Sequence, residues 1–353
     1  MTSTGKHSPV ICTDDAWILF ASDSPPTVDD LKEKVVGAYA GTPASLWWSI
    51  GDHEVYHYET QVGEILGEGY EDLDDSSHPY SFVHSSGPGS MKNMAENTRH
   101  LIETCGGPLT ALVDLCREAD IEFFPRVRMN SHYEIDPAHP AYGKFRREHP
   151  EWLIGRPGEE IAEGSIQWGI RTGKDYAFPQ VREYMAGIIS ELFERFDVDG
   201  VEMDFYRHPA FFRIEEAYQN RYLMTDLIRH VRDRMNAVGD QRGKHLKLAV
   251  RVAATIRDSM RIGLDVEHWM AEGLVDIVVV GGGHVPFETP VEEFVEAARG
   301  TGCLVYGCIN SGRHLDEKNI RALASRFWGQ GASGVYLYNY YTMSPEWNRR
   351  VLN

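Results

Sequence analysis

Short apolar segments alternate with amphipathic segments along the chain, and this alternation indicates how the chain folds. Segments rich in Val, Ile, Leu and Phe are separated by stretches whose apolar residues recur at helical spacing. The clearest amphipathic helix begins at Pro179 and keeps apolar residues at intervals of three and four as far as Phe196. The pattern predicts eight strands, one in each of the ranges 10–14, 44–50, 121–130, 196–209, 246–253, 275–280, 304–309 and 334–340.

Each predicted strand is separated from the next by at least one predicted helix, which is typical of a parallel sheet. Eight such units close most economically into a (β/α)8 TIM barrel, which we predict as a single domain over residues 1–353. An open doubly wound sheet is the alternative, but Gly281-Gly282-Gly283 lacks the GxGxxG spacing of a phosphate-binding loop. Long segments at 51–93 and 131–178, after strands two and three, either cover the barrel mouth or form a homodimer contact.

The fourth predicted strand places two carboxylates on one face. Because side chains alternate along a strand, Gly200, Glu202 and Asp204 share one side while Val201 and Met203 share the other. The apolar side packs on helices, so the carboxylates point into the barrel. Buried carboxylates need a partner or a function.

Polar residues gather at the carboxyl ends of the predicted strands, where a TIM barrel carries its active site. Asp204 is the leading catalytic candidate because it lies nearer the mouth than Glu202 and, we predict, beyond easy reach of the deeper arginines. The further catalytic candidates are Asp14, Asp15, His132 and Glu202. The substrate-binding candidates are Arg126, Arg128, Asn130, Arg207, Arg251, Trp47, Trp48, Asn310 and Tyr338.

Structural roles compete with these functional ones. Arg128, Glu202 and Arg251 lie on neighbouring strands and would also form a buried ion-pair cluster without catalytic function. Asp14 and Asp15 compete for one inward position, so one of them would cap the following turn. The aromatic candidates would serve equally well in the core.

Carboxylates surrounded by arginines and aromatic rings favour general acid–base cleavage of a glycosidic bond, and the arginines suit an acidic sugar. Asp204 would act opposite Asp15 or His132. A metal-dependent isomerase or hydrolase is one alternative, although the sequence has no His-x-His pair at a strand end. A saccharide-binding barrel without catalysis is the other.

The composition narrows the partners. A net charge of −18 argues against binding nucleic acid or an anionic membrane surface, which leaves a carbohydrate substrate as the predicted partner. Five cysteines without a CxxC pair predict neither a disulfide framework nor a zinc site. We expect no cofactor and no metal, and a cytoplasmic location, because the first residues lack the apolar segment of a signal peptide.

Two motifs resemble known families. The segment 199–209, DGVEMDFYRHP, preceded by 179–184, PQVREY, resembles the PxVRxY…DGxxxDxxRxP pattern of the family 10-like glycosyl hydrolases. The segment 149–153, HPEWL, is similar to another part of that family, whose commoner members often have His at the position of Glu202. The resemblance implies a glycosidase-like (β/α)8 barrel with Asp204 as the acidic residue of the motif. A fainter resemblance to the inverting sialidases of glycoside hydrolase family 156 implies catalytic and sugar-binding roles for Asp14, His132, Arg126, Arg128 and Arg207.

Overall fold

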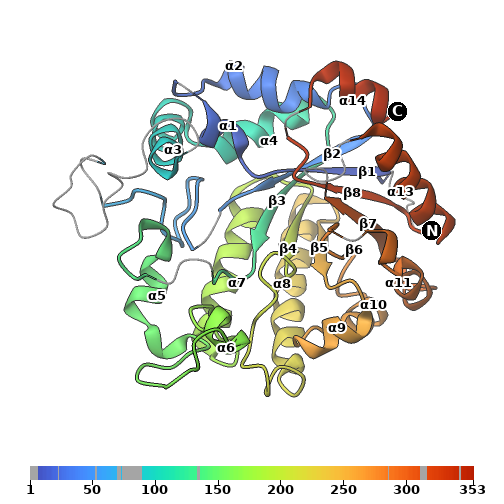
Figure 1. Cartoon of the computed structure of the whole chain (residues 1–353). Helices are drawn as coiled ribbons and strands as arrows, with labels where there is room; N and C mark the ends of the chain where they lie inside the picture. Colours follow the sequence, from blue (N-terminus) through green and yellow to red (C-terminus); the bar gives the residue numbers. More distant parts are fainter. Residues whose placement is uncertain are drawn as a thin grey trace.

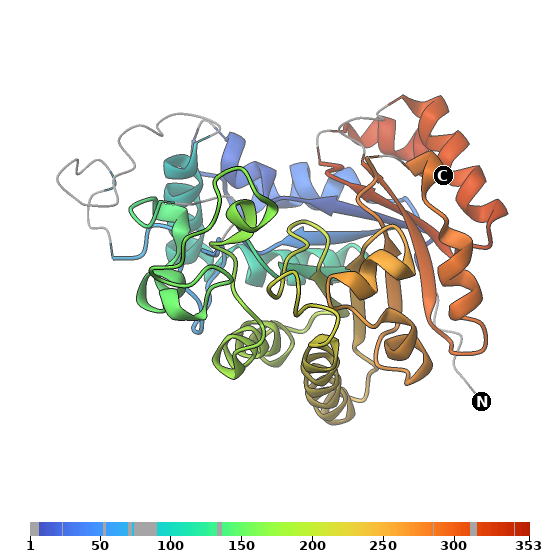
Figure 2. The ribbon, with the colours of Figure 1, turned by 60° about the horizontal axis from the view of Figure 1, so that its bottom comes forward.

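The predicted barrel is confirmed. A computed structural model of the chain describes residues 7–22, 24–51, 54–69, 73, 90–132, 136–284, 286–310, 316–341 and 343–353. Its strands form a closed parallel barrel in the order β1 to β8, with the helices packed around the outside (Figures 1 and 2). The strands are β1 Val10–Asp14, β2 Ala44–Ser49, β3 Phe123–Arg128, β4 Gly200–Asp204, β5 Lys247–Val252, β6 Ile277–Val280, β7 Leu304–Asn310 and β8 Gly334–Tyr338.

The barrel has two apolar layers separated by its strands. Outward side chains pack against the helices, and inward ones form a second cluster that contains Trp47, Phe124 and Tyr336. Trp47 stacks on Phe124 with ring centroids 4.5 Å apart. No side chain fits at Gly200, because its Cβ would lie 2.4 Å from the Phe124 ring. The interior near the start of β4 is therefore filled and closed to ligands.

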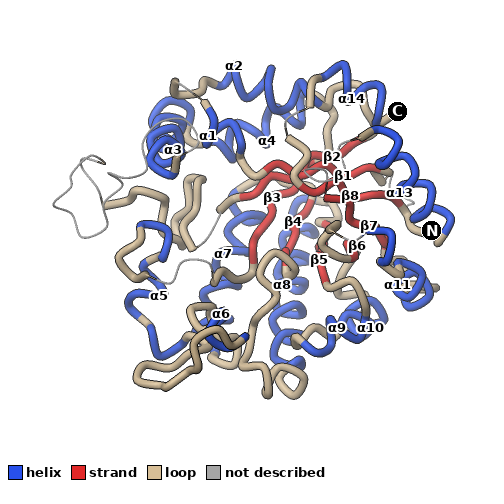
Figure 3. The backbone as a smooth tube through the Cα atoms, viewed as in Figure 1, coloured by secondary structure: helices blue, strands red, loops and turns tan. Residues whose placement is uncertain are grey.

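The helices lie between consecutive strands or next to the chain ends (Figures 1 and 3). The helix predicted from Pro179 is present as α7, and α3 and α4 are separated at Gly106-Gly107, with Pro108 at the first position of α4. The bounds are α1 Trp17–Ala21, α2 Val28–Asp30, α3 Met91–Cys105, α4 Pro108–Glu118, α5 Lys144–Glu148, α6 Ile166–Ile170, α7 Pro179–Arg195, α8 Arg221–Arg242, α9 Ile256–Arg261, α10 Val266–Ala271, α11 Val291–Ala297, α13 Glu317–Gly329 and α14 Pro345–Val351. Among the described helices, none is long and apolar enough to cross a membrane.

The segment after β2 is attached to the barrel wall where the structure describes it. The Glu191 carboxylate on α7 accepts hydrogen bonds from the Tyr58 and Thr60 hydroxyls at 2.8 and 2.6 Å. A fully buried ion pair joins Lys174 to Glu54 across the two long segments. These contacts fix residues 54–69 against α7 and the segment after β3, whereas most of 70–89 lies outside the described residues.

Candidate active site

The end of β1 directs two neighbouring carboxylates to different places. Asp14 Oδ1 accepts a hydrogen bond from the Trp17 amide at 2.9 Å and so caps the turn into α1. Ala16 adopts a left-handed conformation, with φ 58°, and Asp15 turns toward the barrel interior. Burial raises the pKa of Asp14 to about 7. Of the two alternatives in the sequence, Asp14 is thus the capping residue and Asp15 the inward one.

Asp15 lies between two arginines of β3. Arg126 Nη2 contacts its Oδ1, and Arg128 Nη2 lies 3.0 Å from its Oδ2. Burial raises the pKa of Asp15, but the charges of Arg128 and Arg126, and then of Arg207 and Arg251, outweigh it and hold that pKa below its usual value. The Asp15 side chain is 21% exposed, whereas those of Arg126 and Asp204 are completely buried.

Asp204 is fully engaged by protein groups. Arg251 donates from Nε and Nη2 to Oδ1 and Oδ2 of Asp204, each at 2.8 Å, and the amides of Tyr206 and Arg207 donate to Oδ1 at 3.0 Å. Burial raises the pKa of Asp204, but Arg251 and Arg126 outweigh it and keep the pKa below its usual value. The expectation that Asp204 lies beyond the arginines was wrong, because the strand register places it directly between Arg128 and Arg251.

Glu202 lies one layer deeper and is completely buried. The Tyr336 hydroxyl is 2.9 Å from both Glu202 oxygens, and Arg126 Nε is 3.8 Å from Oε2. Burial, with the charge of Asp204 next, raises the pKa of Glu202 to about 8. Glu202 is therefore protonated at neutral pH and forms part of the floor beneath the site.

The remaining inward candidates surround this cluster. The guanidinium carbons of Arg251 and Arg126 lie 4.2 and 5.1 Å from the centre of the Tyr338 ring, which is a cation–π arrangement. Asn310, at the end of β7, is 3.4 Å from His284 Nδ1. Tyr338 and Asn310 thus lie at the mouth, as the sequence predicted.

His132 follows β3 at the rim of the barrel. Its ring is half-buried and meets the His208 ring edge-on, with centroids 4.7 Å apart. Burial lowers its pKa, and the charges of Arg146 and Arg207 lower it further, so the ring is neutral at pH 7. Arg207 therefore acts electrostatically on both His132 and Asp15.

Three substrate-binding predictions need correction. Trp47 lies in the closed apolar interior and Trp48 in the layer between strands and helices, and both are completely buried. Asn130 donates from Nδ2 to the carbonyl oxygens of Lys174 and Ala210 at 2.9 and 2.5 Å, and its Oδ1 accepts from two amides. These four hydrogen bonds use all of the bonding capacity of the Asn130 side chain and attach the segment after β3. The prediction failed because strand parity alone does not distinguish a residue of the barrel wall from one at the mouth.

Sequence reasoning missed other residues near the cluster. His57 is buried, and its Nε2 lies 2.6 Å from the Ser49 carbonyl oxygen. Burial lowers the pKa of His57 to about 4, and the opposing effects of the Ser49 hydrogen bond and of the Asp15 charge are smaller. Tyr336 was detectable, because it shares the inward parity of Tyr338. His57 gave no such signal, since it lies in an irregular segment without periodicity.

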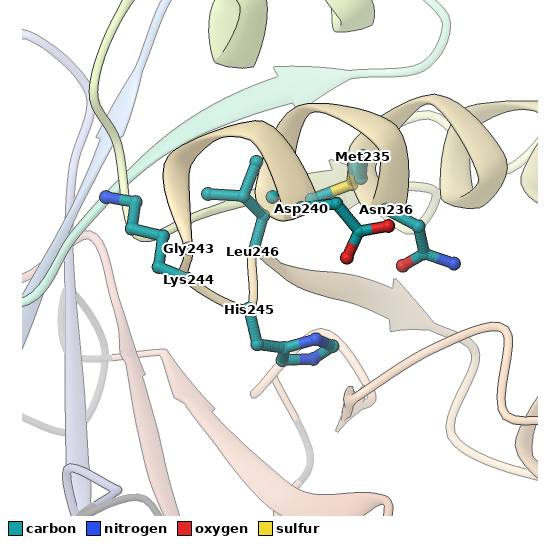
Figure 4. Close-up of a pocket in the computed structure, with 8 residues that line it drawn as sticks. Met235, Asn236, Asp240, Gly243, Lys244, His245 and Leu246 are labelled. Carbon is teal, nitrogen blue, oxygen red and sulfur yellow. The ribbon is translucent and has the colours of Figure 1, made fainter.

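A cavity of about 510 Å³ lies at the C-terminal end of α8 and the start of β5 (Figure 4). Its lining includes Asp240, Lys244 and His245, and none of the predicted site residues. Since Leu246 directly precedes β5, this cavity lies at the opposite end of the barrel from the arginines. Within the described ranges, no three or more His, Cys, Asp or Glu side chains are grouped so as to hold a metal ion.

The chain is a (β/α)8 barrel with a carboxylate–arginine cluster at the carboxyl ends of its strands, and its fold is similar to that of glycoside hydrolase-like barrels. Residues 92–226 match the family model described as Glycosyl hydrolase-like 10, which confirms the predicted resemblance over that segment, less than half of the chain. No curated protein sequence matches the chain significantly.

Solved structures of similar fold include glycoside hydrolases. The glycoside hydrolase domain of PgaB from Bordetella bronchiseptica is 12% identical, with a TM-score of 0.54, over 98% of this chain and 99% of that domain. The α-L-fucosidase isoenzyme 2 from Paenibacillus thiaminolyticus is 12% identical, with a TM-score of 0.53, over 98% of this chain and 48% of its own. The chain likewise spans only 41% of the GH36 α-galactosidase AgaA from Geobacillus stearothermophilus (12% identity over 98% of this chain, TM-score 0.49). At this identity the similarity shows the fold.

Proposed function

We propose that the protein is a glycoside hydrolase that binds an acidic sugar at the carboxyl end of its barrel. The observation that carries the proposal is the pair of arginines, Arg126 and Arg128, that contact the partly buried carboxylate of Asp15; the charges of Arg207 and Arg251 also lower its pKa. The glycoside hydrolase-like fold supports the reaction class.

The charge balance of the cluster favours an anionic ligand. Four guanidinium groups face two ionised carboxylates, those of Asp15 and Asp204, because Glu202 with a pKa of about 8 is protonated at pH 7. The site is thus positive within a chain whose net charge is −18. A concentrated positive field in a cleft attracts anions and raises their association rate. A sugar carboxylate is also the group that a planar guanidinium binds in a bidentate manner.

Asp15 and His132 are the pair that we propose for catalysis. Asp15 is ionised in the free protein, and an incoming sugar carboxylate would compete for Arg126 and Arg128. The pKa of Asp15 would rise as those charges are shared, so that Asp15 takes up a proton from solvent and can donate it to the leaving oxygen. Neutral His132 would accept a proton from the attacking water. The bond between the anomeric carbon and the leaving oxygen breaks, and the water oxygen takes its place.

Asp204 has a positioning role in this proposal. Its two oxygens hold Arg251 and the turn at Tyr206 and Arg207, so Asp204 orients two arginines rather than contacting the sugar. This differs from the leading catalytic role that the sequence motif indicated for Asp204.

The test is hydrolysis of 4-methylumbelliferyl glycosides of acidic sugars (N-acetylneuraminic and glucuronic acid) against the neutral galactoside and glucoside. We expect turnover of an acidic glycoside only, and a roughly 100- to 10,000-fold loss of kcat in Asp15→Asn and in His132→Gln. Turnover confined to neutral glycosides would contradict the proposal. Tight binding of acidic sugars without turnover of any glycoside would instead support the saccharide-binding barrel.

A further inference from the structure

A second cavity opens next to the arginine cluster. It has a volume of about 400 Å³, and its lining includes Asp14, Trp17, Asp30, Lys34 and Tyr341. Asp14 ends β1, and Tyr341 follows β8, so the cavity lies at the same end of the barrel as the arginines. Its volume is within the range of small-molecule sites, roughly 300–1,000 Å³.

The cavity has an aromatic wall that remains partly exposed. Trp17 stacks on Tyr341 with ring centroids 5.1 Å apart and an angle of 22°. Trp17 is 37% exposed, whereas Trp47, Trp48 and Trp269 are completely buried. A flat indole or phenol ring is the surface on which the C–H face of a sugar stacks.

The exposure of Trp17 does not come from a frayed helix end. Asn93 Nδ2 on α3 donates to the carbonyl oxygens of Phe20 and Ser22, both at 2.9 Å. Asn97 Nδ2 on the same helix donates to the Leu19 carbonyl at 2.8 Å. Two asparagine side chains thus hold α1 in place, and the Trp17 ring is presented at a fixed position.

The lining also supplies donors and acceptors. It includes Lys34, Asp30 and Asp14, and the Lys34 ammonium lies 2.7 Å from the Asp30 carboxylate. Carboxylates accept and an ammonium donates, which together match the hydroxyl groups around a sugar ring. A cavity that combines aromatic rings with such groups fits a neutral sugar better than it fits an apolar ligand or a free anion.

Tyr341 connects this cavity to the arginine cluster. Burial raises the pKa of Tyr341 to about 12, with the charges of Asp15 and Asp14 contributing next. Tyr341 lines the cavity together with Asp14, and Asp15, which pairs with the arginines, is the next residue along the chain. A ligand that fills the mouth and extends past Tyr341 would enter the cavity.

We propose that this cavity is a subsite for a neutral sugar ring joined to the acidic sugar, on its leaving-group side. The substrate is then at least a disaccharide, with the acidic ring over the arginines and the neutral ring against Trp17. This inference rests on the proposed function for the position of the acidic ring.

The test compares acidic monosaccharides with oligosaccharides that carry the same acid on a neutral ring. Calorimetric titration with N-acetylneuraminic acid and 3′-sialyllactose, and with glucuronic acid and a glucuronyl-galactose disaccharide, gives the affinities. If the oligosaccharide is cleaved, the titrations are carried out in the catalytically impaired variant Asp15→Asn. We expect one oligosaccharide to bind about tenfold tighter than its monosaccharide, a difference of about 1.4 kcal/mol.

Trp17→Ala should abolish that difference while leaving the monosaccharide affinity unchanged. Trp328→Ala is the matched control, because Trp328 is exposed on α13 and lines neither the cavity nor the arginine cluster. In protein labelled with 5-fluorotryptophan, the ¹⁹F resonance of Trp17, assigned with Trp17→Phe, should shift with the oligosaccharide and not with the monosaccharide.

The outcomes separate the two proposals. Equal affinities for monosaccharide and oligosaccharide, with an unmoved Trp17 resonance, overturn the subsite and leave the proposed function standing. If none of the four sugars binds, the proposed function fails and the subsite fails with it.

Discussion

Replacing Asp204 by Asn should destabilise the fold rather than remove a reacting group. Asn keeps one oxygen, which can still accept from the Tyr206 and Arg207 amides. Its NH2 group would then face the Nη2 donor of Arg251, with which Asp204 Oδ2 pairs at 2.8 Å in the folded protein. Arg251 would be left as a buried charge without its carboxylate.

Removing one partner of a buried ion pair costs about 3–5 kcal/mol. With a guanidinium chloride m-value of about 5 kcal/mol/M for a chain of this size, the unfolding midpoint should fall by roughly 0.6–1 M. Arg251→Met in the same chain removes the unpaired charge, so the double variant should recover part of the loss. The coupling free energy from the single and double variants then measures how much the interaction between positions 204 and 251 contributes to stability.

Unfolding followed by circular dichroism and by tryptophan fluorescence measures the midpoint, and kcat on the acidic glycoside is measured in parallel. Glu202→Gln is the matched control, because Glu202 is equally buried but protonated, and Gln preserves most of its bonding. The reasoning is refuted if Asp204→Asn keeps the wild-type midpoint and loses several orders of magnitude in kcat. Asp204 would then be the catalytic carboxylate that the motif indicated.

Three further predictions concern the ionisable side chains of Glu202, Arg207 and Lys174. Because the folded pKa of Glu202 is raised to about 8, its contribution to stability is present below about pH 4.5 and is lost as the pH rises through 8; Glu202→Gln should flatten the unfolding midpoint over this window, and an unchanged pH profile would contradict the assignment. Arg207→Gln should raise KM for the acidic glycoside several-fold with a smaller change in kcat, and raising the salt concentration should raise the wild-type KM in the same direction; a KM indifferent to both would show that no anion is bound. Lys174→Met should lower the free energy of unfolding by about 3–5 kcal/mol because Glu54 is left buried and unpaired, whereas the double variant Lys174→Met, Glu54→Gln should recover much of it in the same denaturation assay.

Most of the fold was predictable because the apolar periodicity and the positions of Gly and Pro indicated the same strands and helices. The predicted first strand has the bounds of β1, and the break between α3 and α4 follows from Gly106-Gly107-Pro108, where Gly107 has φ 128°. Helix α8 begins only at Arg221, although the helical spacing of apolar residues already starts at Ile214. Ile214 and Tyr218 are spaced by four residues, yet both side chains are exposed, so their spacing did not reflect packing. Periodicity predicts a helix only where the apolar residues have a surface to cover.

The charged residues that point into the barrel were predictable, but their pairing was not. Strand parity correctly turned Arg126, Arg128, Glu202, Asp204 and Arg251 inward, since this follows from each strand separately. Which carboxylate pairs with which arginine depends on the register between strands, and one sequence does not reveal it. The sequence therefore did not show that Asp204 is paired with Arg251. It also did not show that the partly exposed carboxylate of the cluster is that of Asp15.

The two sites share a structural origin in the backbone of two neighbouring strand ends. Ala16 after β1 and Asn339 after β8 both have left-handed conformations, with φ 58° and 57°, although neither is glycine. Such a conformation costs roughly 1–2 kcal/mol for a residue such as Ala, and it persists only where surrounding contacts enforce it. Thr13 holds the turn at Asn339, because its hydroxyl accepts from the Asn339 amide and its carbonyl from the Tyr340 amide, both at 2.9 Å. The turn at Ala16 is spanned by the hydrogen bond from the Trp17 amide to Asp14.

The consequence of these two turns is the placement of the functional groups. The turn at Ala16 separates Asp15, which faces the arginines, from Trp17, which faces the cavity, and the turn at Asn339 precedes Tyr341, which stands between them. Backbone strain of this kind concentrates where side chains must be held in fixed positions for binding or catalysis. In the two proposals, the turns at the β1 and β8 ends thus place the acidic ring and the neutral ring of one substrate next to each other.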